Sequence, residues 1–190
     1  DNTRIIAAKP TIDKVLADSG SCVLMSHLGR PKGQDDNLSL RHIVAEIEKV
    51  LGVRVQFSNQ TIGTHAEQTA KALLPGQVML LENLRFYNEE TKGDKQFAQS
   101  LAKLADAYIN DAFGTAHRAH ASTTTVANFF PTSKYFGFLL AKEIYAIDRV
   151  MTSGEKPVLA ILGGAKVSSK ITIIENILDK VGHLILGGGM

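Results

Sequence analysis

The sequence has little cysteine and little excess of charge. A single cysteine, Cys22, stands among 190 residues, so no disulfide can form within the chain and an oxidising compartment is not implied. The formal net charge of +2 and the pI of about 8.6 are too mild to indicate nucleic acid or a membrane surface as a partner. Any anion site must therefore arise from local clustering of basic residues.

Long hydrophobic runs are also missing. The longest, such as residues 158–162, have the length of a strand, far below the ~20 residues of a membrane-spanning helix. No signal peptide is recognisable, so we expect a cytoplasmic chain with no membrane partner. Because the chain starts at Asp1 and ends in the glycine-rich residues 187–190, we expect it to be a piece of a longer protein.

What is present is the composition of a globular protein. Hydrophobic residues make up 44% and charged residues 21%, with a mean hydropathy of 0.00, which excludes disordered, collagenous and low-complexity chains. Short apolar runs alternate with amphipathic helical patterns. The expected strands are residues 22–26, 53–57, 78–82, 107–110, 158–162 and 184–186. The expected helices are residues 11–19, 39–51, 64–74, 139–151 and 168–181, and one opened by Asp94.

This alternation predicts βαβ units and hence a parallel sheet covered on both faces. The fold class is α/β, a doubly wound, Rossmann-like parallel sheet. Thr64 with Glu67 predicts a capping box, and Pro10 is expected to precede its helix. The long helix near residue 139 marks the boundary between two domains. We divide the chain into a first domain at 1–137, a connecting helix at 138–153 and the start of a second domain at 154–190.

Basic side chains gather after several predicted strands. In open parallel sheets, ligands bind at the carboxyl ends of the strands. A lone arginine there is most often a solvated surface residue, but several together favour an anion site, because the guanidinium fork suits carboxylate and phosphate. Arg4 precedes the first helix and would reach the same edge if a strand preceded this chain. The other members are Arg30, Arg85, Arg118, His27 and His117.

A second candidate site is the turn Gly163-Gly164-Ala165-Lys166, with Lys170 one helical turn later. Glycines allow close backbone approach, and a helix N-terminus favours phosphate. The turn is neither a Walker A loop nor a dinucleotide fingerprint, so the alternative is a tight turn with two solvated lysines. The glycines at 187–189 are a weaker signal of the same kind.

Two other groups favour structural interpretations. His117 and His120 lack a carboxylate or cysteine cluster, so a zinc site is not expected. Asp111 has the chemistry of a general base, but a helix cap or turn is the commoner role for such a residue.

Taken together, these segments resemble the phosphoglycerate kinase family. The motifs occur in the family's order across essentially the whole chain. They are Arg4-Ile5 with Pro10-Thr11-Ile12, Ser26-His27-Leu28-Gly29-Arg30-Pro31, Leu80-Leu81-Glu82-Asn83-Leu84-Arg85-Phe86, Asn110-Asp111-Ala112-Phe113-Gly114-Thr115-Ala116-His117-Arg118-Ala119-His120, Gly137-Phe138-Leu139-Leu140 with Lys142-Glu143, Gly163-Gly164-Ala165-Lys166-Val167 with Lys170-Ile171, and Gly187-Gly188-Gly189-Met190.

The resemblance implies a glycolytic two-domain kinase that moves a phosphoryl group reversibly between 1,3-bisphosphoglycerate and ADP, giving 3-phosphoglycerate and ATP. It implies a monomer that uses Mg²⁺ with the nucleotide, with metal ligands outside this chain. Arg4 and Lys166 would be catalytic. The resemblance places 3-phosphoglycerate on Arg4, His27, Arg30, Arg85 and Arg118, with His117 in support. It places the nucleotide on Gly163, Gly164, Ala165, Lys170, Gly187, Gly188 and Gly189.

The chain also departs from the family pattern. An early strand with an Asp and an Asn for the substrate is missing, as is the downstream nucleotide pocket. Ser169 stands where many members have Asp, which questions a metal contact there. Three hypotheses therefore stand: part of an active kinase, a non-catalytic module that binds a phosphorylated metabolite, and a structural fragment. We expect negligible turnover from the 190 residues alone.

Overall fold

The structure is a computed structural model that describes residues 2–153, 156–164 and 171–188. The chain divides into two compact units, Asp1–Ala141 and Lys142–Met190, called unit 1 and unit 2 below. The boundary falls within helix α6 (Phe138–Ser153), whose first turn belongs to unit 1. None of the described helices has the length and apolarity to cross a membrane.

Unit 1 is built on a parallel sheet in the order β1-β3-β2, formed by Cys22–Leu24, Val78–Leu81 and Val55–Ser58. The central strand β3 is buried along its whole length, because its alternate side chains enter two cores. Met79 lies in one core and Val78 in the other. This is the two-sided covering that the sequence predicts, so the α/β class with parallel sheets is confirmed.

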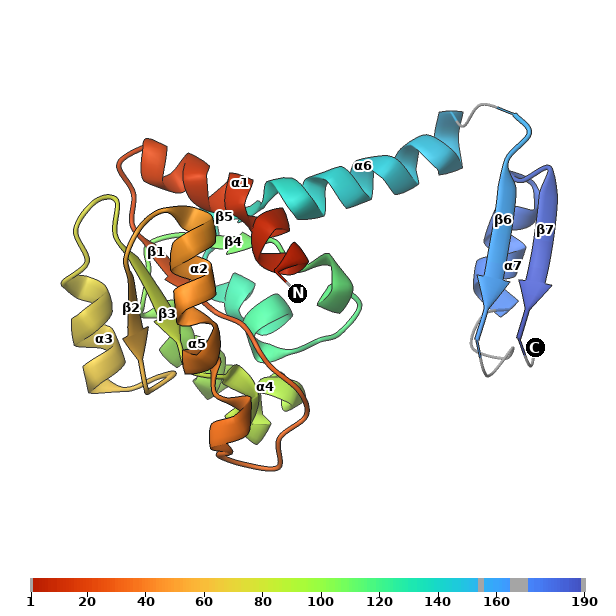
Figure 1. Cartoon of the computed structure of the whole chain (residues 1–190). Helices are drawn as coiled ribbons and strands as arrows, with labels where there is room; N and C mark the ends of the chain where they lie inside the picture. The colour runs from red at the N-terminus through yellow and green to blue at the C-terminus, as the bar shows by residue number, and fades with distance from the viewer. Residues whose placement is uncertain (1, 154–155, 165–170, 189–190) are drawn as a thin grey trace. The chain divides into compact units, whose positions relative to one another are not determined.

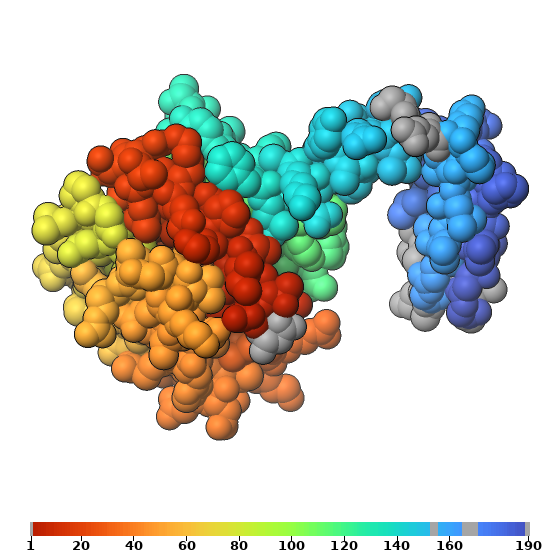
Figure 2. Space-filling view, turned by 45° about the horizontal axis from the view of Figure 1, so that its top comes forward, coloured from red at the N-terminus to blue at the C-terminus, as the bar shows by residue number. Residues whose placement is uncertain are grey.

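Helices supply both cores. One core receives α1 (Thr3–Ala17) and α2 (Val44–Leu51), which lie side by side on one face of unit 1 in Figures 1 and 2. The Asn2 side chain joins them by donating to Glu46 Oε1 at 2.8 Å. The other core receives α3 (Thr64–Lys71) and α5 (Lys95–Ala102). As expected, Asp94 caps α5, accepting a hydrogen bond from the Phe97 N–H at 2.8 Å.

The expected start of the first helix is wrong. Helix α1 begins at Thr3, and Pro10 lies inside it rather than before it. Proline removes one backbone donor from a helix. Here the apolar face of α1, which includes the buried Ile12 together with Val15, packs on the second core, and tertiary packing outweighs the local penalty.

Two further local expectations are wrong. The helix at α3 is capped by Gly63 at φ +99°, and its side-chain capping box is absent, because Thr64 is already its first residue. The helix expected over 39–51 is a 3₁₀ turn, Leu40–Ile43, followed by α2, since the Ser39 hydroxyl accepts from the Arg41 N–H at 3.2 Å. Gly52 ends α2 in the left-handed conformation, as expected.

A second, two-stranded parallel sheet in unit 1 pairs β4 (Tyr108–Asn110) with β5 (Lys134–Phe136). The sequence predicted β4, whereas β5 is not among the expected strands. Strand β5 is three residues long and exposed, so it leaves no hydrophobic alternation in the sequence.

Unit 2 is a single parallel βαβ unit made of β6 (Leu159–Gly163), α7 (Ile171–Leu178) and β7 (His183–Gly187). The strand expected at residues 158–162 is present as β6, but the expected covering of the sheet on both faces is not seen in the described part of unit 2, where Leu159 is 52% and Ile161 68% exposed. The single helix α7 can cover only one face of the sheet formed by β6 and β7. The apolar side chains of β6 on the other face therefore stay exposed. The expected helix start at residues 168–170 lies outside the described residues.

Candidate functional site

The loop after β1 places His27 and Arg30 beside the segment that follows β3. Asn83 joins the two segments: it is fully buried, and its amide donates to the carbonyls of Leu28 at 2.8 Å and Leu38 at 2.9 Å. Its side-chain oxygen accepts from the Arg85 N–H at 3.0 Å. One amide side chain therefore sets the position of both segments.

Arg85 lies in the 3₁₀ turn Leu84–Phe86, directly after β3. One end of its guanidinium donates to the Gly29 carbonyl, with Nη1 at 2.9 Å. Its Nε is buried without a hydrogen-bond partner. A buried donor without an acceptor is unfavourable, which favours an anion-binding role for this side chain. Burial lowers the pKa of Arg85, and the charges of Arg118 and Arg30 add to that effect.

The loop after β4 brings Arg118 and His117. Arg118 Nε lies 3.3 Å from His117 Nε2 and donates to it. The Arg118 carbonyl accepts from the hydroxyls of Thr123 at 2.9 Å and Thr124 at 3.3 Å. Thr123 is part of a π-helical turn, Ala121–Thr125, which follows His120. The backbone at Arg118 is thus held in place by hydrogen bonds, while the Arg118 side chain is exposed.

Arg4 reaches the same region from the first turn of α1. Its charge, together with those of Arg85, His120 and Arg118, lowers the pKa of His27, although burial is the largest cause. The pKa of His27 falls to about 4, so the imidazole is neutral near pH 7 and acts as a hydrogen-bonding group.

We call the six predicted substrate residues the basic cluster: Arg4, His27, Arg30, Arg85, His117 and Arg118. The structure brings them together, since His27 is affected by the charges of Arg4, Arg85 and Arg118, and Arg30 and His117 act on Arg85 and His120 in turn. Among the residues that the structure describes, no arginine of the cluster has a carboxylate in ion-pair distance. Such a concentration of unpaired cations is stabilised by binding an anion.

Sequence reasoning missed three residues that build this site. Asn83 was noted only as part of a motif. His120 was weighed only as a metal ligand, yet it is buried at 7% exposure behind the cluster. Glu90, 2% exposed, lies 3.8 Å from His120 Nδ1. The usable signal for Asn83 was its place directly after a buried strand; the Glu90–His120 pair is 30 residues apart and left none.

Asp111 is a helix cap in this structure. Its Oδ1 accepts from the Leu140 N–H at 3.0 Å, in the first turn of α6. Its Oδ2 accepts from the Thr11 hydroxyl at 2.7 Å, and Thr11 in turn accepts from the Phe138 N–H at 2.8 Å. The structural interpretation made from the sequence is confirmed, because both oxygens are engaged at a helix N-terminus.

In unit 2, glycines stand at the ends of both strands. Gly163 pairs with Gly187 in the register of β6 and β7. Gly164 has φ +129° and Gly188 φ +84°, conformations that a side chain disfavours. The predicted nucleotide-side residues Ala165, Lys166, Lys170 and Gly189, together with Ser169, lie outside the described residues, so their placement stays a prediction.

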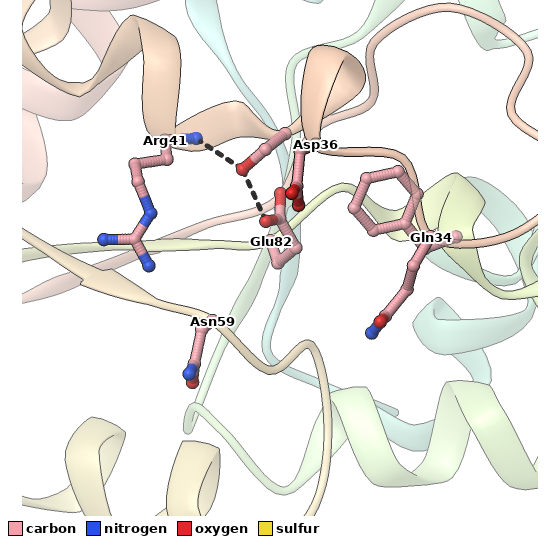
Figure 3. A pocket seen from close by; sticks show the side chains of 7 residues that line it. Gln34, Asp36, Arg41, Asn59 and Glu82 are labelled. Atoms are coloured by element: carbon pink, nitrogen blue, oxygen red, sulfur yellow. Dashed lines mark hydrogen bonds between the residues drawn. The ribbon is translucent and has the colours of Figure 1, made fainter.

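A polar cavity of about 260 Å³ lies at the same sheet edge in unit 1, at the ends of β2 and β3 (Figure 3). The carboxylate of Glu82 is saturated there, since it accepts from the Ser39 hydroxyl and from two backbone N–H groups. The Arg41 guanidinium lies 4.7 Å from the Phe57 ring centre. No predicted site residue lines this cavity, whose walls are Gln34, Asp36, Ser39, Arg41, Asn59, Glu82 and Phe86.

The described residues do not fit a metal. They contain no group of three or more histidine, cysteine, aspartate or glutamate side chains placed to hold an ion. We therefore assign no Mg²⁺ ligand in residues 2–153, 156–164 and 171–188.

Comparison with known proteins gives the site its context. The family model described as phosphoglycerate kinase matches residues 1–190. The phosphoglycerate kinase of Moorella thermoacetica is 53% identical over the whole chain, which covers 48% of that protein. The cytosolic phosphoglycerate kinase of Nicotiana tabacum is 49% identical, with 47% of it covered.

Two solved structures of phosphoglycerate kinases also match this chain. The phosphoglycerate kinase of Coxiella burnetii matches with a TM-score of 0.83 at 38% identity, over 100% of this chain and 47% of that one. That of Pyrococcus horikoshii matches with a TM-score of 0.85 at 32% identity, over 98% of this chain and 47% of that one. The chain thus spans about half the length of the relatives it matches, and it belongs to the phosphoglycerate kinase family.

Proposed function

We propose that the intact protein transfers a phosphoryl group between 1,3-bisphosphoglycerate and ADP, and that unit 1 holds the three-carbon acid. The observation that carries this proposal is the basic cluster, with the partnerless Arg85 Nε inside it, in a chain of this family. A carboxylate and a phosphate on one small molecule match several guanidinium groups converging from separate loops.

In the proposed reaction, the bond between the acyl oxygen and phosphorus breaks, and a new bond forms from the ADP β-phosphate oxygen to that phosphorus. The acid leaves as the carboxylate of 3-phosphoglycerate. Such a transfer asks the protein for positioning and charge neutralisation, and no nucleophilic side chain is needed. Arginines and lysines without an activated nucleophile fit that requirement.

Each part of the cluster has its own task in this proposal. Arg30, Arg85 and Arg118 bind substrate oxygens, and the neutral His27 offers a hydrogen bond. Arg4 and Lys166 neutralise charge on the moving phosphoryl group, the latter by family resemblance. Glycines at the ends of β6 and β7 let nucleotide phosphates approach the backbone. Bound with the nucleotide, Mg²⁺ would supply neutralisation of the phosphate charges.

The test is a coupled assay on the intact protein with 3-phosphoglycerate and Mg-ATP, beside calorimetric titration of 3-phosphoglycerate alone. Kinase function predicts both turnover and binding. Binding without turnover would favour the alternative, a module that holds a phosphorylated metabolite. Neither binding nor turnover would contradict both.

The compartment and the assembly state belong to the same proposal. The relatives from tobacco and wheat carry the word cytosolic in their names. We propose a cytosolic monomer that has no nucleic-acid partner, and fractionation together with size-exclusion chromatography tests it.

A further inference from the structure

Glu90 is a buried carboxylate directly behind the basic cluster. It lies on the short helix α4 (Asn88–Lys92) and is 2% exposed. Its Oε1 lies 3.8 Å from His120 Nδ1. Ser122 donates two hydrogen bonds to it, from N–H to Oε2 at 3.0 Å and from the hydroxyl to Oε1 at 2.6 Å. Burying a carboxylate is unfavourable unless it is both hydrogen-bonded and paired with positive charge.

The cluster supplies that positive charge. Glu90 raises the pKa of Arg85 and of His120, whereas burial and the neighbouring cations lower both pKa values. The basic side chains that face His120 are Arg85, Arg118 and His117. Within the described part of the chain, Glu90 is the one acidic group that acts on His27, Arg85 or His120. Its charge therefore offsets the mutual repulsion of the cluster.

The surroundings hold Glu90 firmly. The Thr125 hydroxyl donates to the Gly93 carbonyl at 3.0 Å, which ties the end of α4 to the turn that contains Ser122. The Tyr108 hydroxyl donates to the Ser122 carbonyl at 2.7 Å. Because these contacts restrain both Glu90 and Ser122, the Glu90 carboxyl group stays beside His120 whether or not an anion is bound.

We propose that Glu90 is a resident counter-charge that stabilises the basic cluster in its anion-free state and, by the same charge, weakens the binding of anions there. This inference deepens the proposed function and rests on it only in taking the cluster as an anion site. It makes Glu90 a positioning residue that sets substrate affinity without touching substrate.

The variant Glu90→Gln separates this role from simple packing. The glutamine oxygen can accept from the Ser122 N–H, and its amide can donate to the Ser122 hydroxyl, so both hydrogen bonds survive while the charge is lost. Removing one nearby negative charge is expected to tighten binding of a divalent anion by about three- to tenfold at low salt. The anion-free protein is expected to melt at a lower temperature than wild type.

The experiment titrates sodium sulfate into the intact protein by calorimetry, at pH 8 and low ionic strength. The matched control is Glu89→Gln on the same helix, whose side chain is exposed. We expect tighter sulfate binding in Glu90→Gln and binding within twofold of wild type in Glu89→Gln. Histidine NMR should also show a lower pKa for His120 in Glu90→Gln alone.

Unchanged or weaker sulfate binding in a folded Glu90→Gln protein would overturn the proposal, because a merely structural role predicts that result. If this variant is unfolded without sulfate, folding on addition of millimolar sulfate, but not of sodium chloride at equal ionic strength, supports the proposal. Failure to fold in saturating sulfate overturns it. If the wild-type protein binds sulfate but shows no turnover, the kinase function alone is contradicted. If the wild-type protein binds no sulfate, both the anion site of the proposed function and the proposal about Glu90 are overturned.

Discussion

In the proposed function, the strand ends of unit 1 and of unit 2 would hold phosphate in opposite ways. Unit 1 uses charge, carried by side chains whose loops are fixed by buried groups such as Asn83 and Glu90. Unit 2 offers bare backbone, with Gly163 beside Gly187 and left-handed Gly188. The first arrangement depends on side-chain contacts between distant segments, and the second depends on the absence of side chains.

The largest loss of stability is expected from Asn83→Ala in unit 1. The change leaves the carbonyls of Leu28 and Leu38 and the N–H of Arg85 without their buried partner. We expect a loss of about 3–5 kcal/mol in the free energy of unfolding. Urea denaturation followed by circular dichroism measures it. The control is Asn59→Ala, an exposed asparagine directly after β2, expected to change stability by less than about 0.5 kcal/mol.

Gly137→Ala is the next largest expected effect. A Cβ at this position would lie 2.2 Å from Asp111 Cγ, the carboxylate that caps α6. The cap has to move, so we expect destabilisation of about 2–3 kcal/mol. Thermal melting measures the effect. At Gly114, an added Cβ meets nothing within 4 Å, so a comparable loss in Gly114→Ala would contradict the steric explanation.

A moderate pH effect follows from His27. Its pKa is about 4 in the folded protein and 6.5 when unperturbed, so the unfolded chain binds more protons between these values. Stability therefore falls as the pH drops from about 6.5 to about 4, by about 1–2 kcal/mol after allowance for partial exposure. Denaturation midpoints across this range should show the slope, and His27→Gln should reduce it. An identical slope in both proteins would assign the effect to other groups.

The smallest loss of stability is expected in unit 2, from a substitution that strains the backbone. Gly188 has φ +84°, so Gly188→Ala is expected to destabilise the unit by about 1 kcal/mol through backbone strain alone. Hydrogen exchange of the amides in β6 and β7 measures this local loss. Gly187→Ala is the comparison, since its nearest contact would be an ordinary 3.8 Å. Equal effects at both positions would argue against a backbone cause.

The sequence predicted the features that depend on residues close together in the chain. The strand–helix alternation and the Asp94 cap are encoded within a few residues, and the structure confirms both. Apart from Arg4, which lies on α1, the basic side chains were expected together because each follows a strand end, where ligands bind in open parallel sheets. The sequence did not predict that these strands belong to two separate sheets.

The remainder depended on tertiary contacts that no local pattern records. Helix α1 continues through Pro10 because its apolar face is buried in the core. Strand β5 forms only because β4 lies beside it. The pair of Glu90 and His120 joins segments 30 residues apart. That pairing also changes the site's chemistry, because the sequence shows cations alone and the structure adds a buried anion behind them.

The central claim is that the basic cluster binds 3-phosphoglycerate, and one titration tests it most directly. Calorimetry with 3-phosphoglycerate compares the intact wild-type protein, Arg30→Ala and the control Arg54→Ala, whose side chain is 95% exposed and outside the cluster. The account predicts that Arg30→Ala weakens binding by about 1.5–3 kcal/mol, with Arg54→Ala close to wild type. Equal affinities in all three proteins would contradict it.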